Sequence, residues 1–470
     1  MRRPLTVNAL VLVAGVAAAV LGAACGDTLV DHGARDLLAL DCQPGTATCE
    51  VGADLACVPD SPSRCGATCA DCTAAGAVPA GAVAACVLPA GGGQGACGFE
   101  CTDGRLRCGD GCCEATAISA GWKHTCAITS AGSLVCWGAD DWGQISDVVT
   151  LGVFPPTVAG PRLAPFGEGV TAVAAGQLHT CAVVGGVVRC VGWNDDGQAP
   201  DAVPGLADVV ALAAGQRHSC ALTAGGAVTC WGHPDQRGGN DGTPRFTPIA
   251  SGAIRIAAGR DHTCAVMGSG EVRCWGGNAS AQLGDGTQGP PKGPVSPQVG
   301  NANAFVAGGH SHTCSAARTE GRPTGGGNLY DAVRCWGAQP GALFLLAVPQ
   351  LTPAIPLKST DQAVIRFAPL GIATGRTHVC VLGEDATFGV HCFGPENGSG
   401  QLGTTGEPIS EAAGIQSSLG ARAIAAGDDH TCAIWSDGGV RCWGLNANGQ
   451  LGDGTAVFPG AGVIVTVSGR

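Results

Sequence analysis

From residue 117 onward, the chain repeats one short arrangement of small, polar and apolar positions. Two clear copies are Ala-Gly-Trp-Lys-His-Thr-Cys-Ala, which begins at Ala120, and Ala-Gly-Asp-Asp-His-Thr-Cys-Ala, which begins at Ala426. In each copy a glycine stands five positions before the cysteine and a histidine stands two before it. The mean spacing of about 51 residues suits a blade of a β-propeller. The seven copies are centred on Cys126, Cys181, Cys220, Cys264, Cys314, Cys380 and Cys432.

Each copy continues into a second cysteine, and the spacing predicts an antiparallel hairpin. Four copies separate their cysteines by ten residues, which requires a loop with an odd number of residues. A three-residue loop places a glycine at its third position, where left-handed backbone geometry is needed. Copy two separates its cysteines by nine residues and centres Gly185-Gly186 on a two-residue loop. The four glycines at the third loop position are Gly132, Gly226, Gly270 and Gly438.

In this register the two cysteines of a copy face each other across the hairpin, at a separation that a disulfide can bridge. We therefore predict one bridge inside each copy. The predicted pairs are Cys126–Cys136, Cys181–Cys190, Cys220–Cys230, Cys264–Cys274, Cys314–Cys335, Cys380–Cys392 and Cys432–Cys442.

Composition excludes several classes of protein. With 78 glycines and 28 prolines among 470 residues, a long helical bundle is excluded. The apolar fraction of 45% excludes wholesale disorder, since it is enough to form a core. The formal net charge of −12 gives no electrostatic footprint for DNA or RNA, so no nucleic-acid partner is expected.

The N-terminus has the layout of a secretory signal. Two arginines precede an apolar run over residues 9–21, which is too short to cross a bilayer as a permanent helix. Cys25 follows small residues and resembles the lipid-modified cysteine of bacterial lipoproteins, although Gly22 stands where leucine is usual. Ordinary cleavage after small residues is the alternative. We expect a lipoprotein signal peptide over residues 1–24, lipidation of Cys25, and an exported protein that is anchored in the cell envelope or secreted.

A cysteine-dense segment over residues 25–114 precedes the repeats, which occupy residues 115–470. The chain has 27 cysteines, an odd number, and setting Cys25 aside leaves even numbers in both parts. An exported chain with this count is expected to form disulfides. Zinc binding by the Cys69-x-x-Cys72 pair is an alternative, and the pairing among these cysteines is left open. The segment is expected to act as a stapled stalk, or alternatively as a ligand-binding module.

Several copies end in a Gly-Gln-Leu-Gly turn, as at residues 449–452, although copies three and five lack a good one. Together with the Ala-Gly-x-x-His-Thr pattern and the Trp-Gly pair, this resembles the regulator of chromosome condensation repeat. The resemblance implies an all-β fold, a seven-bladed β-propeller. The eukaryotic namesake is a nucleotide exchange factor, an activity that we do not expect in an exported chain. The same family includes a secreted bacterial inhibitor of β-lactamase.

The repeated histidines resemble a metal site, since each lies on the same strand face as a cysteine. A residue repeated in every blade usually serves packing, so we expect no metal and no cofactor. The Asp-Gly-Thr triplets at 241–243, 285–287 and 453–455 are interpreted as turns, because no complete calcium loop is present. Enzyme signatures are also absent from the sequence. The histidines are His124, His179, His218, His262, His312, His378 and His430.

The sequence therefore predicts a monomeric, non-enzymatic binding or scaffold protein whose propeller face engages an extracellular protein or an envelope polymer. The alternatives are a propeller enzyme, such as a lyase, with its site in the central channel, and an extracellular enzyme inhibitor. Copy five contains an insertion over residues 318–331, whose Arg318, Arg322 and Tyr330 are candidate partner-binding residues. A tolerated surface insertion is the alternative for that segment.

Overall fold

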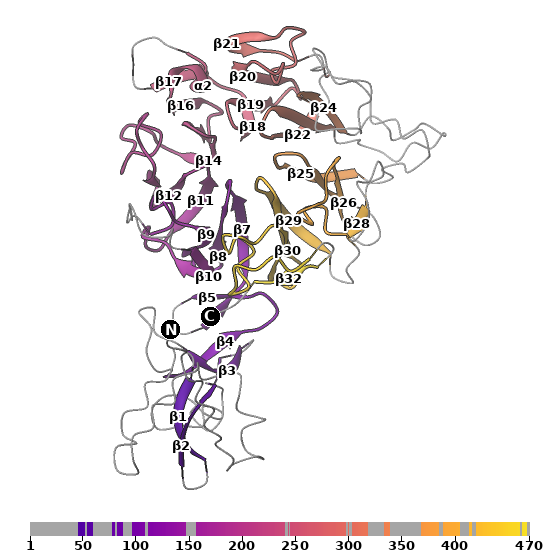
Figure 1. The fold of residues 1–470 in the computed structure, drawn as a ribbon. Helices are drawn as coiled ribbons and strands as arrows, with labels where there is room; N and C mark the ends of the chain where they lie inside the picture. The colour runs from indigo at the N-terminus through magenta and orange to yellow at the C-terminus, as the bar shows by residue number, and fades with distance from the viewer. Residues whose placement is uncertain are drawn as a thin grey trace, which may run out of the picture. The chain divides into compact units, whose positions relative to one another are not determined.

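The computed structural model describes residues 46–51, 54–59, 78–79, 82–87, 96–108, 111–146, 157–239, 243, 245–297, 299, 303–317, 333–338, 368–384, 389–404, 413–415, 420–460 and 463–467 (Figure 1). The chain forms two compact units, Met1–Glu100 and Cys101–Arg470. The second unit therefore begins before residue 115, where the repeats were expected to start. Within the described ranges, no helix has the length and apolar character needed to cross a membrane.

The first unit contains two antiparallel pairs of short strands in its described part. Strand β1 (Thr46–Val51) pairs with β2 (Asp54–Pro59), and Cys49 lies opposite Ala56 in this ladder. Strands β3 (Ala82–Val87) and β4 (Ala96–Cys101) form the second pair, which reaches the boundary with the next unit.

The second unit is a seven-bladed β-propeller, with seven antiparallel sheets of three or four strands in its described residues (Figure 1). A short hairpin of β5 (Leu106–Cys108) and β6 (Gly111–Cys113) precedes them. The sheets are: β7 (Ala115–Ala120), β8 (His124–Thr129), β9 (Leu134–Ala139), β10 (Thr157–Leu163); β11 (Val170–Ala175), β12 (His179–Val184), β13 (Val187–Gly192); β14 (Val209–Ala214), β15 (His218–Thr223), β16 (Val228–Gly232), β17 (Arg245–Ile249); β18 (Ala253–Ala258), β19 (His262–Met267), β20 (Val272–Asn278), β21 (Gly289–Val295); β22 (Asn303–Gly308), β23 (His312–Ala317), β24 (Val333–Gly337); β25 (Ala368–Thr374), β26 (Val379–Glu384), β27 (Val390–Phe393), β28 (Ala413–Ile415); and β29 (Ala421–Ala426), β30 (His430–Trp435), β31 (Val440–Gly444), β32 (Val465–Thr466).

The central hairpins have the register that the cysteine spacing predicts. Thr129 pairs with Ser133 around a three-residue loop, and Gly132 at the third position has φ +77°. In blade 2 the loop shortens to Gly185-Gly186, and both glycines have positive φ. The turn chemistry inferred from the sequence is therefore confirmed.

Seven disulfides join directly opposed cysteines, one in each blade. Their Cα atoms are 4.0–4.1 Å apart, the close approach of a non-hydrogen-bonded antiparallel pair. The fourteen sulfurs belong to residues that are buried, so each bridge is part of the core. The bridges are Cys126–Cys136, Cys181–Cys190, Cys220–Cys230, Cys264–Cys274, Cys314–Cys335, Cys380–Cys392 and Cys432–Cys442.

The apolar core lies between neighbouring blades. One cluster joins the Cys220–Cys230 bridge of blade 3 to Ala265 and Trp275 of blade 4. The tryptophan that follows the second cysteine also carries a polar contact across the seam. In blade 1 the Trp137 indole N–H donates to the backbone carbonyl of Gln450 in blade 7, at 2.9 Å. The Gly-Gln-Leu-Gly turn thus offers a carbonyl to the blade that follows it.

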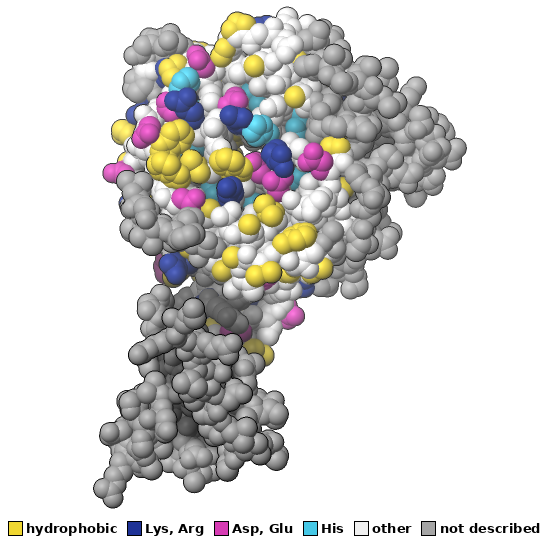
Figure 2. Space-filling model, viewed as in Figure 1, with side chains coloured by type: hydrophobic (Ala, Val, Ile, Leu, Met, Phe, Trp, Pro, Cys, Tyr) yellow, Lys and Arg dark blue, Asp and Glu magenta, His cyan; other side chains and the backbone are white. Residues whose placement is uncertain are grey.

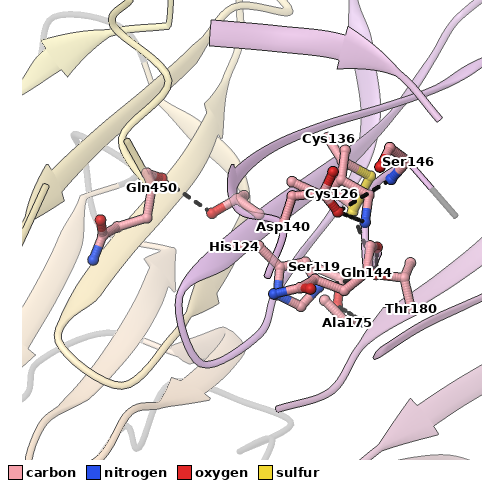
Figure 3. Close-up of a disulfide and its surroundings, with 12 residues drawn as sticks. Ser119, His124, Cys126, Cys136, Asp140, Gln144, Ser146, Ala175, Thr180 and Gln450 are labelled. Atoms are coloured by element: carbon pink, nitrogen blue, oxygen red, sulfur yellow. Dashed lines mark hydrogen bonds between the residues drawn. A yellow bond between two sulfur atoms is a disulfide. The ribbon is translucent and has the colours of Figure 1, made fainter. Parts of the chain in front are cut away.

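Buried histidines form a second repeated contact between blades. The Nε2 atom of His124 in blade 1 lies 2.9 Å from the Thr180 hydroxyl oxygen in blade 2 (Figure 3). Among the described blades, six of the seven seams carry this histidine–hydroxyl bond. The bond between His430 and Thr125 joins blade 7 to blade 1 and so closes the ring. The pairs are His124–Thr180, His179–Ser219, His218–Thr263, His262–Thr313, His378–Thr431 and His430–Thr125, at 2.6–2.9 Å.

The hydroxyl geometry determines which imidazole nitrogen carries the proton. The Thr180 hydroxyl donates to the backbone carbonyl of Gln144 at 2.8 Å, so its oxygen accepts from His124. His124 is therefore the neutral form protonated at Nε2. Burial lowers its pKa from 6.5 to about 4, which keeps the imidazole uncharged at neutral pH.

The seam between blades 5 and 6 lacks this bond. Blade 6 has Val379 at the position of the hydroxyl residue, and the buried Nε2 atom of His312 has no hydrogen-bond partner. The seam keeps an apolar contact, because Val379 and Val381 pack with the Cys314–Cys335 bridge.

The ring closes without exchange of a strand between the first and last blades. Blade 1 is built from residues 115–163 and blade 7 from residues 421–466. The segment before blade 1 strengthens this seam. The N–H of Ala115 donates to the carbonyl of Gly438, and the N–H of Val440 donates to the carbonyl of Gly104, both at 2.9 Å.

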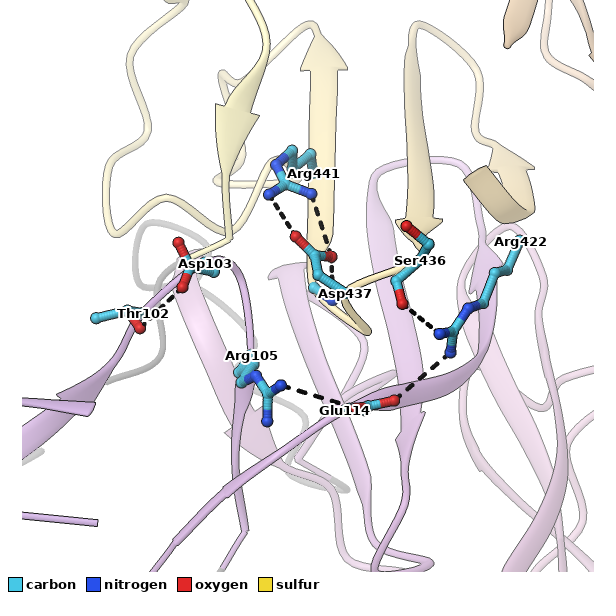
Figure 4. Close-up of polar contacts among 9 residues, drawn as sticks. Thr102, Asp103, Arg105, Glu114, Arg422, Ser436, Asp437 and Arg441 are labelled. Atoms are coloured by element: carbon cyan, nitrogen blue, oxygen red, sulfur yellow. Dashed lines mark hydrogen bonds and ion pairs between the residues drawn. The ribbon is translucent and has the colours of Figure 1, made fainter. Parts of the chain in front are cut away.

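Charged side chains also link the segment before blade 1 to blade 7. Glu114 pairs with Arg105 at 3.7 Å and with Arg422 of blade 7 at 3.5 Å (Figure 4). The neighbouring hairpin is cross-linked by Cys101–Cys112 and Cys108–Cys113. This explains why the compact unit starts at Cys101, since residues 101–114 are built onto the last blade.

Replacing Thr180 by Val should destabilise the propeller by roughly 1–3 kcal/mol, because the His124 donor and the Gln144 carbonyl both lose their partner. Thr180→Ser should cost less, about 1 kcal/mol, because it removes one buried methyl group and keeps the hydroxyl. Blade 3 already uses serine at this position. Denaturant unfolding of the oxidised protein gives both values. Equal stability of the two variants would show that the histidine–hydroxyl bond contributes nothing.

Candidate protein-binding face

The seven Gly-x-x-His turns meet around one mouth of the central channel. Backbone N–H groups of successive turns donate to carbonyls of the next blade, as from Gln177 to Gly215 at 3.0 Å and from Gln216 to Arg260 at 2.8 Å. The chain of bonds crosses the closing seam from Asp428 to Trp122 at 3.4 Å. The mouth is therefore held by main-chain contacts, and the side chains around it are free to vary.

Glycine is required in these turns because the backbones approach closely. A Cβ atom on Gly176 would lie 2.7 Å from the carbonyl oxygen of Gly215 and 2.5 Å from Cε1 of its own His179. The seven glycines and the small residues before them, five alanines with Gly308 and Thr374, leave a hollow of about 240 Å³ at the mouth. Figure 2 shows charged, histidine and apolar side chains gathered around the centre of the face in view.

In six blades the residue after the glycine lines this hollow, and most of the side chains at this position are already paired. Arg260 donates through Nε to Gln216 Oε1 at 3.0 Å, and its Nη1 lies 3.0 Å from Nε2 of His310. Arg376 pairs with Asp429 at 2.8 Å. These contacts tie neighbouring blades together at the rim of the channel.

Asp428 differs from its neighbours. No ion pair or side-chain hydrogen bond holds its carboxylate within the described structure. Burial, together with the charge of the neighbouring Asp429, raises the pKa of Asp428 to about 7, while Arg376, Arg260 and Lys123 oppose the shift. The channel mouth thus contains a carboxyl group that titrates near neutral pH.

The same face carries an apolar patch on blades 1 and 2. Six of the nine tryptophans are buried inside the blades, whereas Trp122, Trp142 and Trp193 are partly exposed. All three lie at turns on the Gly-x-x-His face. The rings of Trp142 and Trp193 have centroids 6.1 Å apart, and the Arg217 guanidinium lies 6.0 Å from the Trp193 ring.

Trp193 reaches this face because blade 2 departs from the repeat. The other tryptophan-bearing copies place the residue directly after the second cysteine, where it is buried. In blade 2 Val191 fills that core position and Trp193 follows the end of the strand. The backbone N–H of Trp193 donates to the carbonyl of Leu178 at 2.9 Å.

The predicted partner-binding residues Arg318, Arg322 and Tyr330, and the predicted lipidation site Cys25, lie outside the described residues. The described Asp-Gly-Thr segments are local turns, since Asp285 and Asp453 accept bonds from their own Thr287 and Thr455. Within the described ranges, no cluster of three or more His, Cys, Asp or Glu side chains is arranged to hold a metal ion. Six of the seven repeated histidines face hydroxyl groups, and the cysteines beside all seven are in disulfides.

The variable residues around the channel mouth were not singled out from the sequence. The available signal was the pair of unconstrained positions between the glycine and the histidine, where the copies differ most. The displaced tryptophan of copy two was a second signal, because it broke a pattern kept elsewhere.

Four segments match the family model of the regulator of chromosome condensation (RCC1) repeat: residues 115–144, 209–238, 253–282 and 421–450. Over these four segments the chain is similar to the RCC1 repeat. These four segments lie in blades 1, 3, 4 and 7, and each runs from the inner strand to the turn that follows the third strand.

The relatives that share RCC1 repeats or the fold are distant. The secretion-regulating guanine nucleotide exchange factor of Bos taurus is 32% identical over 113 residues, which cover 19% of this chain and 24% of that protein. The match thus spans about a quarter of that relative's length. Human WBSCR16 has a TM-score of 0.57 at 17% identity, covering 71% of this chain and 94% of that one. Prp20p of Saccharomyces cerevisiae has a TM-score of 0.51 at 17% identity, covering 66% and 80%. These likenesses show an RCC1-like propeller fold.

Replacing Asp428 by Asn should stabilise the propeller at pH 8 and change little near pH 4. The raised pKa means that the folded state disfavours the ionised carboxylate, a cost that is absent below pH 3.8 and complete above pH 7. The difference in unfolding free energy between variant and wild type should grow to as much as roughly 4 kcal/mol. Denaturant titrations from pH 4 to pH 8 measure it.

Asp195→Asn is the matched control, because it removes the same charge from an exposed position on this face. A difference for Asp428→Asn that does not change with pH, or that equals the control, would contradict the assignment.

Proposed function

We propose that this protein is a binding module that engages a partner protein through the Gly-x-x-His face of its propeller. The observation that carries the proposal is the placement of the tryptophans: the three that are not buried in blades all lie on this face. Exposing large aromatic surface costs free energy in an unbound protein, and tryptophan and arginine are the residues most enriched at the energetic centre of interfaces.

The channel supports binding over catalysis. Its mouth is lined by glycine backbones, and the ionisable Arg260, His310 and Arg376 are engaged by neighbouring side chains, which leaves Asp428 as a single unpaired carboxyl there among the described residues. A lyase-type site in the channel would need such groups to converge on a substrate. We therefore favour a binding role over the enzyme alternative.

The likeness to known proteins is consistent with a protein partner. Yeast Prp20p has binding properties to Gsp1p and histones, and the bovine relative is named as a guanine nucleotide exchange factor. We do not propose exchange activity for this chain. Nine disulfides join its described cysteines, which fits an oxidising compartment rather than one that holds small GTPases.

We further propose that the protein acts outside the cytoplasm, either anchored in the cell envelope through a lipid on Cys25 or secreted. The signal-like N-terminus and the disulfides support this location. An extracellular protein, an envelope polymer, or an enzyme that the propeller inhibits would then be accessible to the face.

The Trp142→Ala/Trp193→Ala double variant should lose the partner in affinity capture from an envelope extract with purified residues 26–470. Each anchor of this type contributes about 2 kcal/mol, so a loss of at least tenfold in captured partner is expected. Phe458→Ala is the control, since Phe458 is also an exposed aromatic residue. Equal capture by the wild type and the double variant would place the interface elsewhere.

Lipidation of Cys25 predicts that the mature protein fractionates with membranes and carries a diacyl or triacyl addition. Intact-mass analysis of the membrane fraction detects it. Cys25→Ser should release the protein into the soluble fraction. A soluble wild-type protein whose N-terminus lies elsewhere would exclude the lipid anchor.

A further inference from the structure

Blades 1, 2, 4, 6 and 7 share one turn after the third strand, but in two of them the turn carries different side chains. In blades 4, 6 and 7 the two residues before the Gly-Gln or Ala-Gln pair are small and uncharged: Ala279-Ser280, Gly398-Ser399 and Ala447-Asn448. In blade 1 they are Asp141-Trp142, and in blade 2 they are Asp195-Asp196. The scaffold does not require acidic or aromatic residues here, because three blades form the turn without them.

The turn geometry is the same in the decorated and undecorated blades. In blade 1 the Gln144 Oε1 atom accepts the Trp142 N–H at 2.8 Å, and in blade 4 the Gln282 Oε1 atom accepts the Ser280 N–H at 2.8 Å. Asp140 takes the place of the asparagine that starts the turn in blade 4 and accepts the N–H of Ile145 at 2.8 Å. The acidic and aromatic side chains of Asp141, Trp142 and Asp195 are therefore additions to a complete turn.

The patch already binds one guanidinium group from within the chain. Arg217 lies 6.0 Å from the Trp193 ring and donates through Nε and Nη2 to both oxygens of Asp196, at 2.5 and 2.6 Å. An aromatic face with a carboxylate at its edge is thus a working arginine site in this structure.

Next to it lies a second partly exposed tryptophan, Trp142, which Asp141 precedes in the same turn. Trp142 is tilted by 53° against Trp193, and within the described ranges neither Asp141 nor Asp195 forms an ion pair. One carboxylate oxygen of Asp141 is buried without a hydrogen-bond partner, and Asp195 is exposed. Arg217 pairs with Asp196 and Lys123 lies 5.0 Å from the Trp122 ring, so the patch has two cations against the three carboxylates of Asp141, Asp195 and Asp196.

We propose that the partner presents an arginine side chain to Trp142, with Asp141 and Asp195 receiving its charge. The inference rests on the proposed function and specifies the partner as a protein with an exposed arginine-bearing segment. The planar guanidinium stacks on the indole and donates to carboxylates at the same time, as Arg217 does on the neighbouring ring. A neutral segment would leave the two carboxylates without a cation and bind more weakly.

The test uses the peptide acetyl-Gly-Gly-Arg-Gly-Gly-amide and its citrulline counterpart, which has the same shape without the charge. Isothermal titration calorimetry at low salt should show that purified residues 26–470 bind the arginine peptide at least tenfold more tightly than the citrulline peptide. The preference should shrink at high salt. Equal affinity for the two peptides, or no binding of either, would overturn the inference.

Two sets of variants locate the site. Asp141→Asn/Asp195→Asn should abolish the tenfold preference, and Trp142→Ala should weaken binding of the arginine peptide by a similar factor. Glu168→Gln/Asp208→Asn is the matched control, because it removes two charges from exposed carboxylates that precede the inner strands β11 and β14, away from this patch. An unchanged preference in the Asp141/Asp195 variant would reject the site.

The peptide test is independent of the partner. If the peptide fails to bind while the tryptophan variant loses the captured partner, the binding face stands and the arginine proposal falls. If the peptide binds and no partner depends on the tryptophans, the proposed function falls and the arginine site remains.

Discussion

The propeller depends on one buried contact that is repeated around the ring, in which a neutral imidazole forms a hydrogen bond with a hydroxyl group of the next blade. In five seams the hydroxyl donates to a main-chain carbonyl, which places the imidazole proton at Nε2 of the histidine. His218 instead donates through Nδ1 to the side-chain oxygen of Gln236. A charged imidazole in this position would be buried without a counter-ion, which explains why the pKa values fall to about 3 or 4. The seam that has Val379 in place of the hydroxyl keeps the packing but lacks the polar link.

Because of this arrangement, the residues that hold the fold together are distinct from the residues that differ between blades. Glycines, histidines and cysteines hold the blades by main-chain and buried contacts, and five blades add the glutamine turn, so the two positions after each glycine can differ in sequence from blade to blade. The two residues before the Gly-Gln or Ala-Gln pair, in the turn after the third strand, can also differ from blade to blade. Chemistry that differs from blade to blade is therefore concentrated on one face, where Trp142, Asp141 and Asp195 stand out against Ala279, Gly398 and Ala447.

Much of the fold could be predicted from the sequence because its constraints are local. The spacing between paired cysteines fixes the parity of a hairpin loop, and the position of Gly132 within that loop then fixes the register. The hydroxyl partner of each histidine could not be predicted in this way, because it lies in another blade. The candidate face was missed for the same reason: Trp142, Trp193 and Arg217 come from three consecutive blades and meet only when these blades pack side by side. The start of the second unit at Cys101 depends on contacts of Gly104 and Glu114 with blade 7, about 300 residues away in sequence.

The order of the bridges along the chain has a consequence for how the protein matures. From Cys126 onward, every described disulfide joins a cysteine to the next cysteine in the sequence, over 9–12 residues in six blades and 21 in blade 5. Closing such short loops costs little chain entropy compared with pairing across blades. An oxidase that links neighbouring thiols as they emerge, one pair at a time, would produce the native connectivity without later reshuffling. The interleaved Cys101–Cys112 and Cys108–Cys113 bridges do not follow this rule, so any need for an isomerase in the described second unit falls on that hairpin.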